Sequence, residues 1–198
     1  MNARGIGLAV VGGACSALAA VAATLDTVTV SHDDGRYHLV AHSFMAAPPA
    51  AVRAVLLDFE DDAYSEISRV YKESGYLDAA SDGTPIVYTR VEGCLLLFCR
   101  SMRRVERLEV VTPHFIRSRV VPEMSDFSYA MSEWTFEPEA GGTRVLYRMS
   151  MEPDFWLPPF VGPMFLRRVL LRGGVDAVER IEELAIEREA GYSGSAKQ

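Results

Sequence analysis

The segment Tyr37–Tyr64, YHLVAHSFMAAPPAAVRAVLLDFEDDAY, is the most informative part of the sequence. Side chains alternate over Tyr37–Phe44, which predicts a strand. Pro48-Pro49 then opens a helix, because proline fits the first helical turn without losing a hydrogen bond. The apolar residues that follow share one helical face at spacing i, i+3, i+4 and i+7: Val52, Val55, Leu56 and Phe59. A second short helix is expected over residues 61–66, where an acidic first turn suits the helix dipole.

The rest of the chain reads as consecutive strands followed by one long helix. Alternating segments separated by turn signals predict strands over residues 67–77, 86–92, 102–111, 115–121, 127–136 and 143–151. A helix is expected from Met164 to Arg188, with one apolar side. Gly173-Gly174 in its middle predicts a bend or a close backbone approach, since each glycine costs roughly 1 kcal/mol against alanine. The pattern indicates an α+β fold with one antiparallel sheet.

Size and charge bound the function. The chain has 198 residues, about one domain, and a formal net charge of −7. An acidic chain gives no electrostatic reason to bind nucleic acid, whose affinity comes mostly from neutralised phosphates. Residues 24–35 read as a polar lead-in, residues 36–190 as the folded domain, and residues 191–198 as a flexible tail.

The N-terminus has the pattern of a secretory signal over residues 1–23. Arg4 precedes an apolar run, Ile6–Ala23, and small residues recur near its end as Ala17-Leu18-Ala19 and Ala20-Val21-Ala22. This pattern predicts a periplasmic or secreted protein. The alternative is an uncleaved membrane anchor, because the run is near the lower length limit for spanning a bilayer.

The sequence mostly lacks the patterns that mark catalytic sites. It holds no Gly-x-Ser-x-Gly elbow and no phosphate-binding glycine loop. His38 and His42 lie on a predicted strand, about 13 Å apart, too far to share a metal. We expect no metal and no cofactor. Alternating charges predict a paired outer sheet face made by Arg100, Arg103, Arg104, Arg107, Glu106 and Glu109.

Three short segments carry a resemblance to a known family. They are Ala47-Pro48-Pro49-Ala50-Ala51-Val52 with Leu57-Asp58, Glu133-Trp134-Thr135-Phe136-Glu137-Pro138, and Gly141-Gly142-Thr143-Arg144-Val145, followed by the amphipathic last helix. In this element order the chain resembles the START-like superfamily, also called SRPBCC, which includes polyketide cyclases, coenzyme Q-binding proteins and ligand-binding plant allergens. The resemblance covers Tyr37–Arg188. It implies a helix-grip fold: a curved seven-stranded antiparallel sheet wrapped around a long C-terminal helix, with two short helices after the first strand and a cavity between sheet and helix.

The resemblance also implies where the cavity opens. A gate would fall on Gly93–Cys99, a latch on Pro122–Asp126 and a third wall on Phe155–Phe160. The gate placement reverses the chain between Cys94 and Cys99, as a disulfide between these residues requires. Export favours that disulfide, because disulfides persist in oxidising compartments. The alternative is two reduced, buried cysteines acting as small hydrophobes.

The function implied is non-catalytic binding or transport of a hydrophobic small molecule, such as a lipid or an isoprenoid. The apolar gate tip either contacts a ligand or a membrane surface, or plugs the core. A polyketide cyclase or dehydratase using the same cavity is the alternative, so the sequence leaves enzyme and carrier open; it identifies no protein partner. The candidate ligand-binding residues are Tyr64, Tyr71, Tyr88, Leu95, Leu96, Leu97, Phe98, Arg119, Trp134, Tyr147, Phe155, Trp156, Phe160, Leu166 and Leu170. For each, the alternative is a core side chain or a charge on the outer sheet face.

Overall fold

The computed structural model describes residues 23–95, 98–155 and 162–195, with side chains for residues 23–93, 100–155 and 174–191. Its strands are β1 (Thr24–Asp33), β2 (Arg36–Met45), β3 (Tyr71–Leu77), β4 (Ile86–Leu95), β5 (Phe98–Thr112), β6 (Phe115–Val120), β7 (Phe127–Glu139) and β8 (Gly142–Pro153). Its helices are α1 (Pro49–Leu56), α2 (Tyr64–Ile67) and α3 (Gly162–Ser195), with 3-10 turns η1 (Glu60–Asp62) and η2 (Pro122–Met124). The predicted α+β architecture, one antiparallel sheet and a long C-terminal helix, is confirmed.

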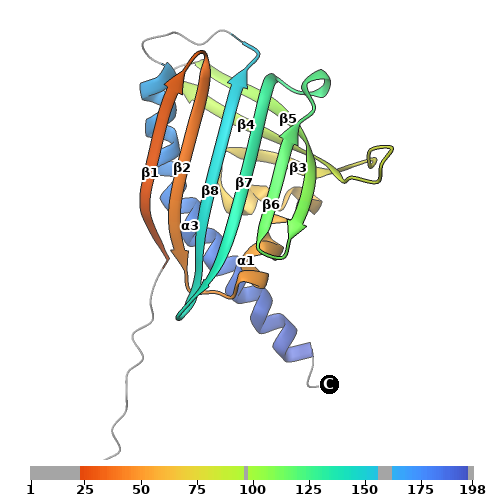
Figure 1. The fold of residues 1–198 in the computed structure, drawn as a ribbon, viewed down its shortest axis with the longest axis vertical. Helices are drawn as coiled ribbons and strands as arrows, with labels where there is room; N and C mark the ends of the chain where they lie inside the picture. Colours follow the sequence, from red (N-terminus) through yellow and green to blue (C-terminus); the bar gives the residue numbers. More distant parts are fainter. Residues whose placement is uncertain (1–22, 96–97, 156–161, 196–198) are drawn as a thin grey trace, which may run out of the picture.

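The strands form one open sheet in the order β1-β2-β8-β7-β6-β5-β4-β3, with every neighbouring pair antiparallel. Helices α1 and α3 contact each other, and α3 also contacts β1 and β2. Both helices lie behind the sheet in Figure 1. We call the sheet face that meets them the inner face, and the opposite face the outer face.

The sheet has eight strands where seven were expected, because the predicted lead-in over residues 24–35 forms β1. Asp34 and Gly35 both have positive φ, 47° and 79°, and connect the paired residues Asp33 and Arg36. Such a two-residue loop matches the right-handed twist of a hairpin, and Asp-Gly is among its preferred sequences. The turn signal was therefore present in the sequence, and the polar composition of β1 concealed it.

The segment after β2 follows the predicted order with shorter elements. Pro48 caps α1 in an extended conformation and Pro49 begins the helix, as expected from the proline pair. The helix ends at Leu56, although Phe59 is still buried beyond it. The second predicted helix is divided into η1 and α2, and the strand expected from residue 67 begins at Tyr71.

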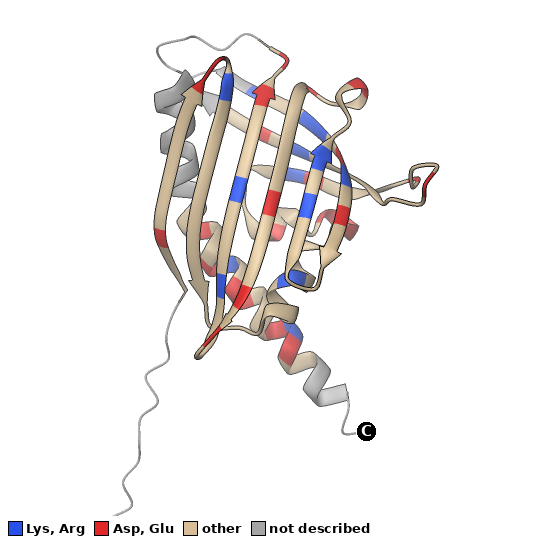
Figure 2. Cartoon of the chain, viewed as in Figure 1, with Lys and Arg blue, Asp and Glu red and all other residues tan. Residues whose placement is uncertain are grey.

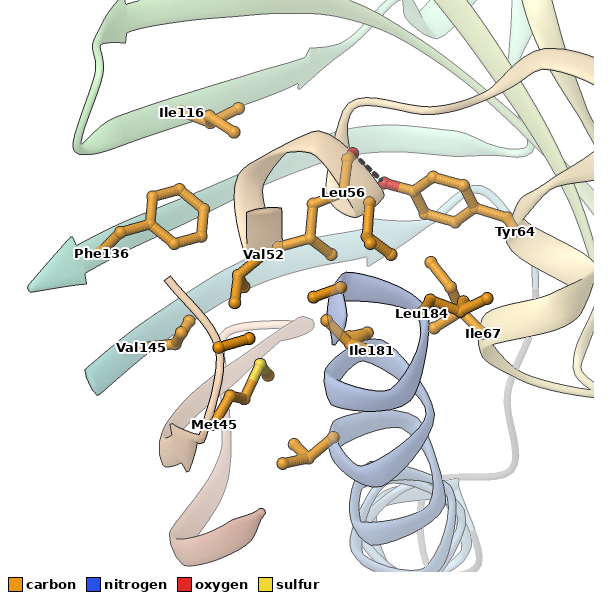
Figure 3. Packing of buried hydrophobic residues seen from close by; sticks show 14 of the residues in the cluster. Met45, Val52, Leu56, Tyr64, Ile67, Ile116, Phe136, Val145, Ile181 and Leu184 are labelled. Atoms are coloured by element: carbon orange, nitrogen blue, oxygen red, sulfur yellow. Dashed lines mark hydrogen bonds between the residues drawn. The ribbon is translucent and has the colours of Figure 1, made fainter. Parts of the chain in front are cut away.

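One apolar cluster joins α1 and α3 to the inner face; we call it the α1 cluster. Figure 3 shows side chains of this cluster from α1, from α3 and from the sheet pointing toward one another. Its buried members include Met45, Val52, Val55, Leu56, Tyr64, Val87, Leu108, Ile116, Phe136, Val145, Val178, Ile181 and Leu184. This end of the sheet is therefore filled by the protein's own side chains.

Helix α3 is assigned as one continuous helix across the central glycine pair. A Cβ added to Gly174 would lie 3.3 Å from Leu25 Cδ2, so the close backbone approach predicted for the glycine pair is confirmed at this residue. Among the residues whose structure is described, we find no helix with both the length and the apolar character needed to cross a membrane.

Candidate functional site

Polar side chains occupy the middle of the inner face and define what we call the central belt. Its members are Thr89 on β4, Arg104 and Glu106 on β5, Ser118 on β6, Ser132 and Trp134 on β7, and Tyr147 on β8. On the α1 side each strand continues into the α1 cluster: Val87, Leu108, Ile116, Phe136 and Val145. The belt thus begins where the packing of α1 ends.

A second apolar group, the Met149 cluster, lies on the other side of the belt. Its buried members are Tyr37, Leu39, Phe127, Ala130, Met149 and Met151, with Met102, Val120 and Tyr147 partly buried against them. Side chains on one face of a strand recur every second residue. Strands β5 to β8 therefore show the same order on the inner face: apolar, polar, apolar.

Arg104 and Glu106 form a buried ion pair at the centre of the belt. Arg104 Nε lies 2.9 Å from Glu106 Oε2, and the two side chains are only 12% and 3% exposed. The Arg104 N–H is not aligned on this oxygen, so the contact is an ion pair without a hydrogen bond at Nε. Ser118 Oγ donates a 2.8 Å hydrogen bond to Glu106 Oε1. Both oxygens of the carboxylate are therefore already engaged.

The two aromatic members of the belt stack on each other. The rings of Trp134 and Tyr147 have centroids 4.9 Å apart and an interplanar angle of 25°. The Tyr147 hydroxyl lies 3.4 Å from Ser132 Oγ. Both residues are only partly buried, although they lie on the inner face. The stacked pair is therefore not sealed off as completely as the α1 cluster.

The belt holds its protons firmly. Burial raises the pKa of Tyr147 to about 12, and burial is also the main cause that raises the pKa of Tyr64 well above its usual value of 10. Burial alone would lower the pKa of Arg104, but Glu106 and the nearby phenols outweigh it and the pKa is raised. At neutral pH the belt thus carries the Arg104 guanidinium, paired with Glu106, and one neutral phenol, Tyr147.

More donors than acceptors remain for a ligand. Thr89 Oγ1 is buried and has no hydrogen-bond partner among the described residues. An arginine carries five N–H donors and no acceptor. For Arg104, the contacts are the ion pair with Glu106 and a 3.9 Å approach of Nη1 to Met149 Sδ. The Thr89 hydroxyl can donate or accept, whereas Arg104 can only donate, so the unused capacity of the belt is mainly that of a hydrogen-bond donor.

The structure brings part of the predicted ligand set together. Trp134 and Tyr147 stand in the belt. Tyr64 is buried in the α1 cluster and donates a 2.7 Å hydrogen bond to the Leu56 carbonyl (Figure 3). Tyr71 meets Tyr64 edge to face, with centroids 5.2 Å apart. Phe155 packs on Phe127 of the Met149 cluster, 6.4 Å between centroids.

Two predicted ligand residues are not in this group. Tyr88 alternates with the inward Val87 and Thr89, and its ring lies over Gly75, 5.6 Å from the Arg103 guanidinium. Arg119 is exposed on the outer face, 3.7 Å from Glu109. Figure 2 shows charges of opposite sign on neighbouring strands of that face. These two residues take the alternative role, part of the outer sheet surface.

Other predicted ligand residues lie outside the described part of the chain. This applies to Leu96, Leu97, Trp156 and Phe160, and to the side chains of Leu95, Phe98, Leu166 and Leu170. In the β4–β5 hairpin the backbones of Cys94 and Cys99 are directly opposite each other. The predicted chain reversal is therefore confirmed, and the disulfide itself stays a prediction.

The sequence interpretation missed Arg104, Glu106, Ser118, Ser132 and Thr89. Arg104 and Glu106 were assigned to a charge-paired outer face, and this was wrong, since both side chains are buried on the inner face. Successive side chains of a strand point to opposite faces, so Arg104 and Glu106 lie on the same face of β5 as the apolar Met102 and Leu108. This pattern could have indicated the inner face, but it was ambiguous, because Val105 on the opposite face is completely buried.

Two hollows lined by described residues lie away from the belt. One, of about 330 Å³, is bordered by Leu77, Ile86, Arg103, Arg107 and Met124. The other, of about 470 Å³, is bordered by Glu60, Asp62, Ser74, Tyr76 and Tyr88. Neither includes a belt residue. The described residues also contain no group of three or more histidine, cysteine, aspartate or glutamate side chains that could hold a metal ion.

Comparison with known families matches residues 37–184 to the family described as Polyketide cyclase / dehydrase and lipid transport. The chain belongs to this family. The match begins in β2 and ends in α3, so it includes every strand of the belt and leaves β1 outside. No curated protein matches the sequence.

Solved structures show that this family member shares the fold of START-superfamily proteins. The Zhui aromatase/cyclase from Streptomyces sp. R1128 has a TM-score of 0.58 at 17% identity, over 77% of this chain and 95% of that one. A START superfamily protein from Mycobacterium smegmatis has a TM-score of 0.58 at 18% identity, over 74% and 98%. A STAR-related lipid transfer protein from Xanthomonas axonopodis has a TM-score of 0.57 at 16% identity, over 81% of this chain and 99% of that one. The structural likeness establishes the shared helix-grip fold, and at such low sequence identity it establishes nothing further.

Proposed function

We propose that this protein binds a hydrophobic small molecule on the inner face of its sheet, without transforming it. The observation that carries the proposal is the order of the inner face: the α1 cluster closes one end, the central belt offers hydrogen-bond donors, and the Met149 cluster follows. A ligand with a polar end at the belt and an apolar body along the Met149 cluster fits this order. The family is consistent with such a role.

The apolar body supplies the affinity. Moving one methylene from water to an apolar site is worth about 0.8 kcal/mol. A chain of about ten carbons therefore gains roughly 8 kcal/mol, which corresponds to a micromolar affinity. The loss of translational and rotational freedom on association reduces this value. Met102, Val120 and Met149 offer the apolar surface for this contact.

The polar end is a neutral hydrogen-bond acceptor. Arg104 and Glu106 cancel in formal charge, and Glu106 is already held by Ser118. A ligand carboxylate would bring an unpaired negative charge into a buried site, which is strongly unfavourable. A carbonyl or ester oxygen accepts from Thr89, Tyr147 or Arg104 without adding charge. We therefore propose a ligand such as a ketone, a quinone or an ester with a long apolar part.

A matched pair of probes tests the proposal. A fluorescent long-chain probe bound to the purified protein is displaced either by a fatty acid or by the methyl ester of the same acid. The ester should displace it at a lower concentration than the acid at pH 7. Tyr147→Phe should weaken ester binding about 2- to 10-fold, the loss of one hydrogen bond. Tyr88→Phe, a phenol on the outer face, is the control and should leave binding unchanged.

Three results would contradict the proposal in different ways. If neither probe binds across a range of chain lengths, the binding function itself is wrong. If the acid binds more tightly than the ester, only the neutral-acceptor argument fails. For the third result, the purified protein is incubated with a polyketide analogue, and the organic extract is analysed by mass spectrometry. Recovery of a cyclised or dehydrated product, rather than the unchanged analogue, would favour the cyclase alternative.

A further inference from the structure

The first described residue of the chain is fixed to the last helix. Ala23 N donates a 3.0 Å hydrogen bond to Glu182 Oε1 on α3, and Ala46 N donates to Glu182 Oε2. Ala23 and Leu25 also pack against the α1 cluster. One carboxylate thus joins the start of β1, the loop after β2 and the last helix.

The sequence immediately before this contact has the pattern of a signal-peptide cleavage site. Ala20-Val21-Ala22 has small residues at the third and first positions before the Ala22–Ala23 bond, as a signal-peptide cleavage site requires. A second motif, Ala17-Leu18-Ala19, would place cleavage three residues earlier. The sequence alone does not choose between these two bonds.

We propose that the exported chain is cleaved between Ala22 and Ala23, and that the new N-terminal ammonium of Ala23 forms an ion pair with Glu182. The proposal rests on the predicted export and is independent of the ligand. Cleavage adds one water across the peptide bond: Ala22 leaves with the carboxylate, and Ala23 gains an amine, which takes up a proton at neutral pH.

The contact with Glu182 is the reason to choose this bond. The nitrogen released by cleavage after Ala22 is the atom that already lies 3.0 Å from the carboxylate. Converting this neutral amide to an ammonium adds a positive charge to the donor, so that a hydrogen bond to a carboxylate becomes an ion pair between two charged groups. Cleavage after Ala19 would leave an uncharged amide at this position. Because Ala23 is packed against the core, cleavage has to precede folding, as it does for a chain processed during export.

Mass spectrometry tests the cleavage site. The full chain is produced in a bacterium with its own N-terminal segment, recovered from the periplasm, and analysed by intact mass and N-terminal sequencing. The expected N-terminus is Ala23. A chain beginning at Ala20, or one that keeps Met1, would overturn the proposed site.

A charge-blocking comparison tests the ion pair. The form beginning at Ala23 is compared with the same form acetylated at its N-terminus, each with and without Glu182→Gln. The substitution should lower Tm by roughly 2–4 °C more in the free-amine form than in the acetylated form. This difference should shrink in 1 M salt, which screens a partly exposed pair. Acetylation alone should also lower Tm in the protein that keeps Glu182. This comparison tests the ion pair even if Glu182→Gln folds poorly. Equal losses in both forms would overturn the ion pair.

Discussion

The buried pair Arg104–Glu106 leads to a prediction of unequal costs. Glu106→Gln keeps the shape of the side chain and an acceptor for Ser118 but leaves the Arg104 charge without its counter-ion. Because the partners are only 12% and 3% exposed, water compensates poorly. Removing one partner of such a pair costs about 3–5 kcal/mol. Replacing both, as in Arg104→Met with Glu106→Leu, should cost far less and can be stabilising.

Urea unfolding measures this difference. With an m-value of about 2 kcal/mol per molar, typical of urea, Glu106→Gln should lower the midpoint by roughly 1.5–2.5 M. The double variant should lie close to the wild type. Glu109→Gln is the matched control, because Glu109 pairs with Arg119 across 3.7 Å on the outer face, where the side chains are 33% and 51% exposed. An exposed pair contributes about 0–1 kcal/mol, so its midpoint should barely move.

Two outcomes would refute the reasoning. A loss below about 1 kcal/mol for Glu106→Gln would mean that solvent reaches the pair and that the belt is not a low-dielectric site. A double variant whose loss equals the sum of the losses of Arg104→Met and Glu106→Leu, each measured alone, would show that Arg104 and Glu106 do not interact energetically. A change in the m-value would point instead to an altered unfolded state.

Three further predictions concern single features. Gly142→Ala should cost about 1–3 kcal/mol, because its Cβ would overlap the Met45 carbonyl oxygen, whereas Gly191→Ala on an exposed turn of α3 should be neutral or slightly stabilising; equal effects in thermal melts would contradict the close approach. The raised pKa of Tyr147 stabilises the fold fully below pH 10 and is lost as pH rises toward 12; Tyr147→Phe should flatten this part of the stability profile, and an unchanged slope would show that Tyr147 ionises normally. Protein recovered from an oxidising compartment should release no thiol on denaturation, since opposed antiparallel residues lie within disulfide range; two free thiols from Cys94 and Cys99 would exclude the bridge.

Local chemistry made much of the fold predictable from sequence. Pro48-Pro49 fixed the start of α1, and the apolar spacing that follows identified its buried face, because both signals act within a few residues. The Asp34-Gly35 turn was equally local. It was passed over because β1 presents mostly polar side chains, and a polar edge strand has little of the apolar alternation by which strands are recognised.

The belt was harder to predict, because it depends on which face of β5 is turned inward. The even-numbered residues from Met102 to Leu108 include Arg104 and Glu106, and the odd-numbered ones include Val105. Both faces of this strand are partly covered: the inner face by the core, and the outer face by the segment around η2, where the Val105 N–H donates to Ser125 Oγ. A strand covered on both sides has no clean alternation, so register had to come from the neighbouring strands.

The chemistry of the belt bears on the choice between a carrier and a catalyst. A general acid or base works best when its pKa lies near the working pH. The fold moves the phenol of the belt the other way: burial raises the pKa of Tyr147 to about 12, and burial also raises the pKa of Tyr64 in the neighbouring α1 cluster. Arg104 holds its proton still more firmly, and Glu106 is occupied by an ion pair and a hydroxyl. Groups that keep their protons remain hydrogen-bond donors over a wide pH range and exchange protons poorly. Turnover at the belt would therefore have to come from holding a reactive ligand in a productive shape, and Tyr147→Phe should then change the affinity for that ligand more than the rate of its conversion.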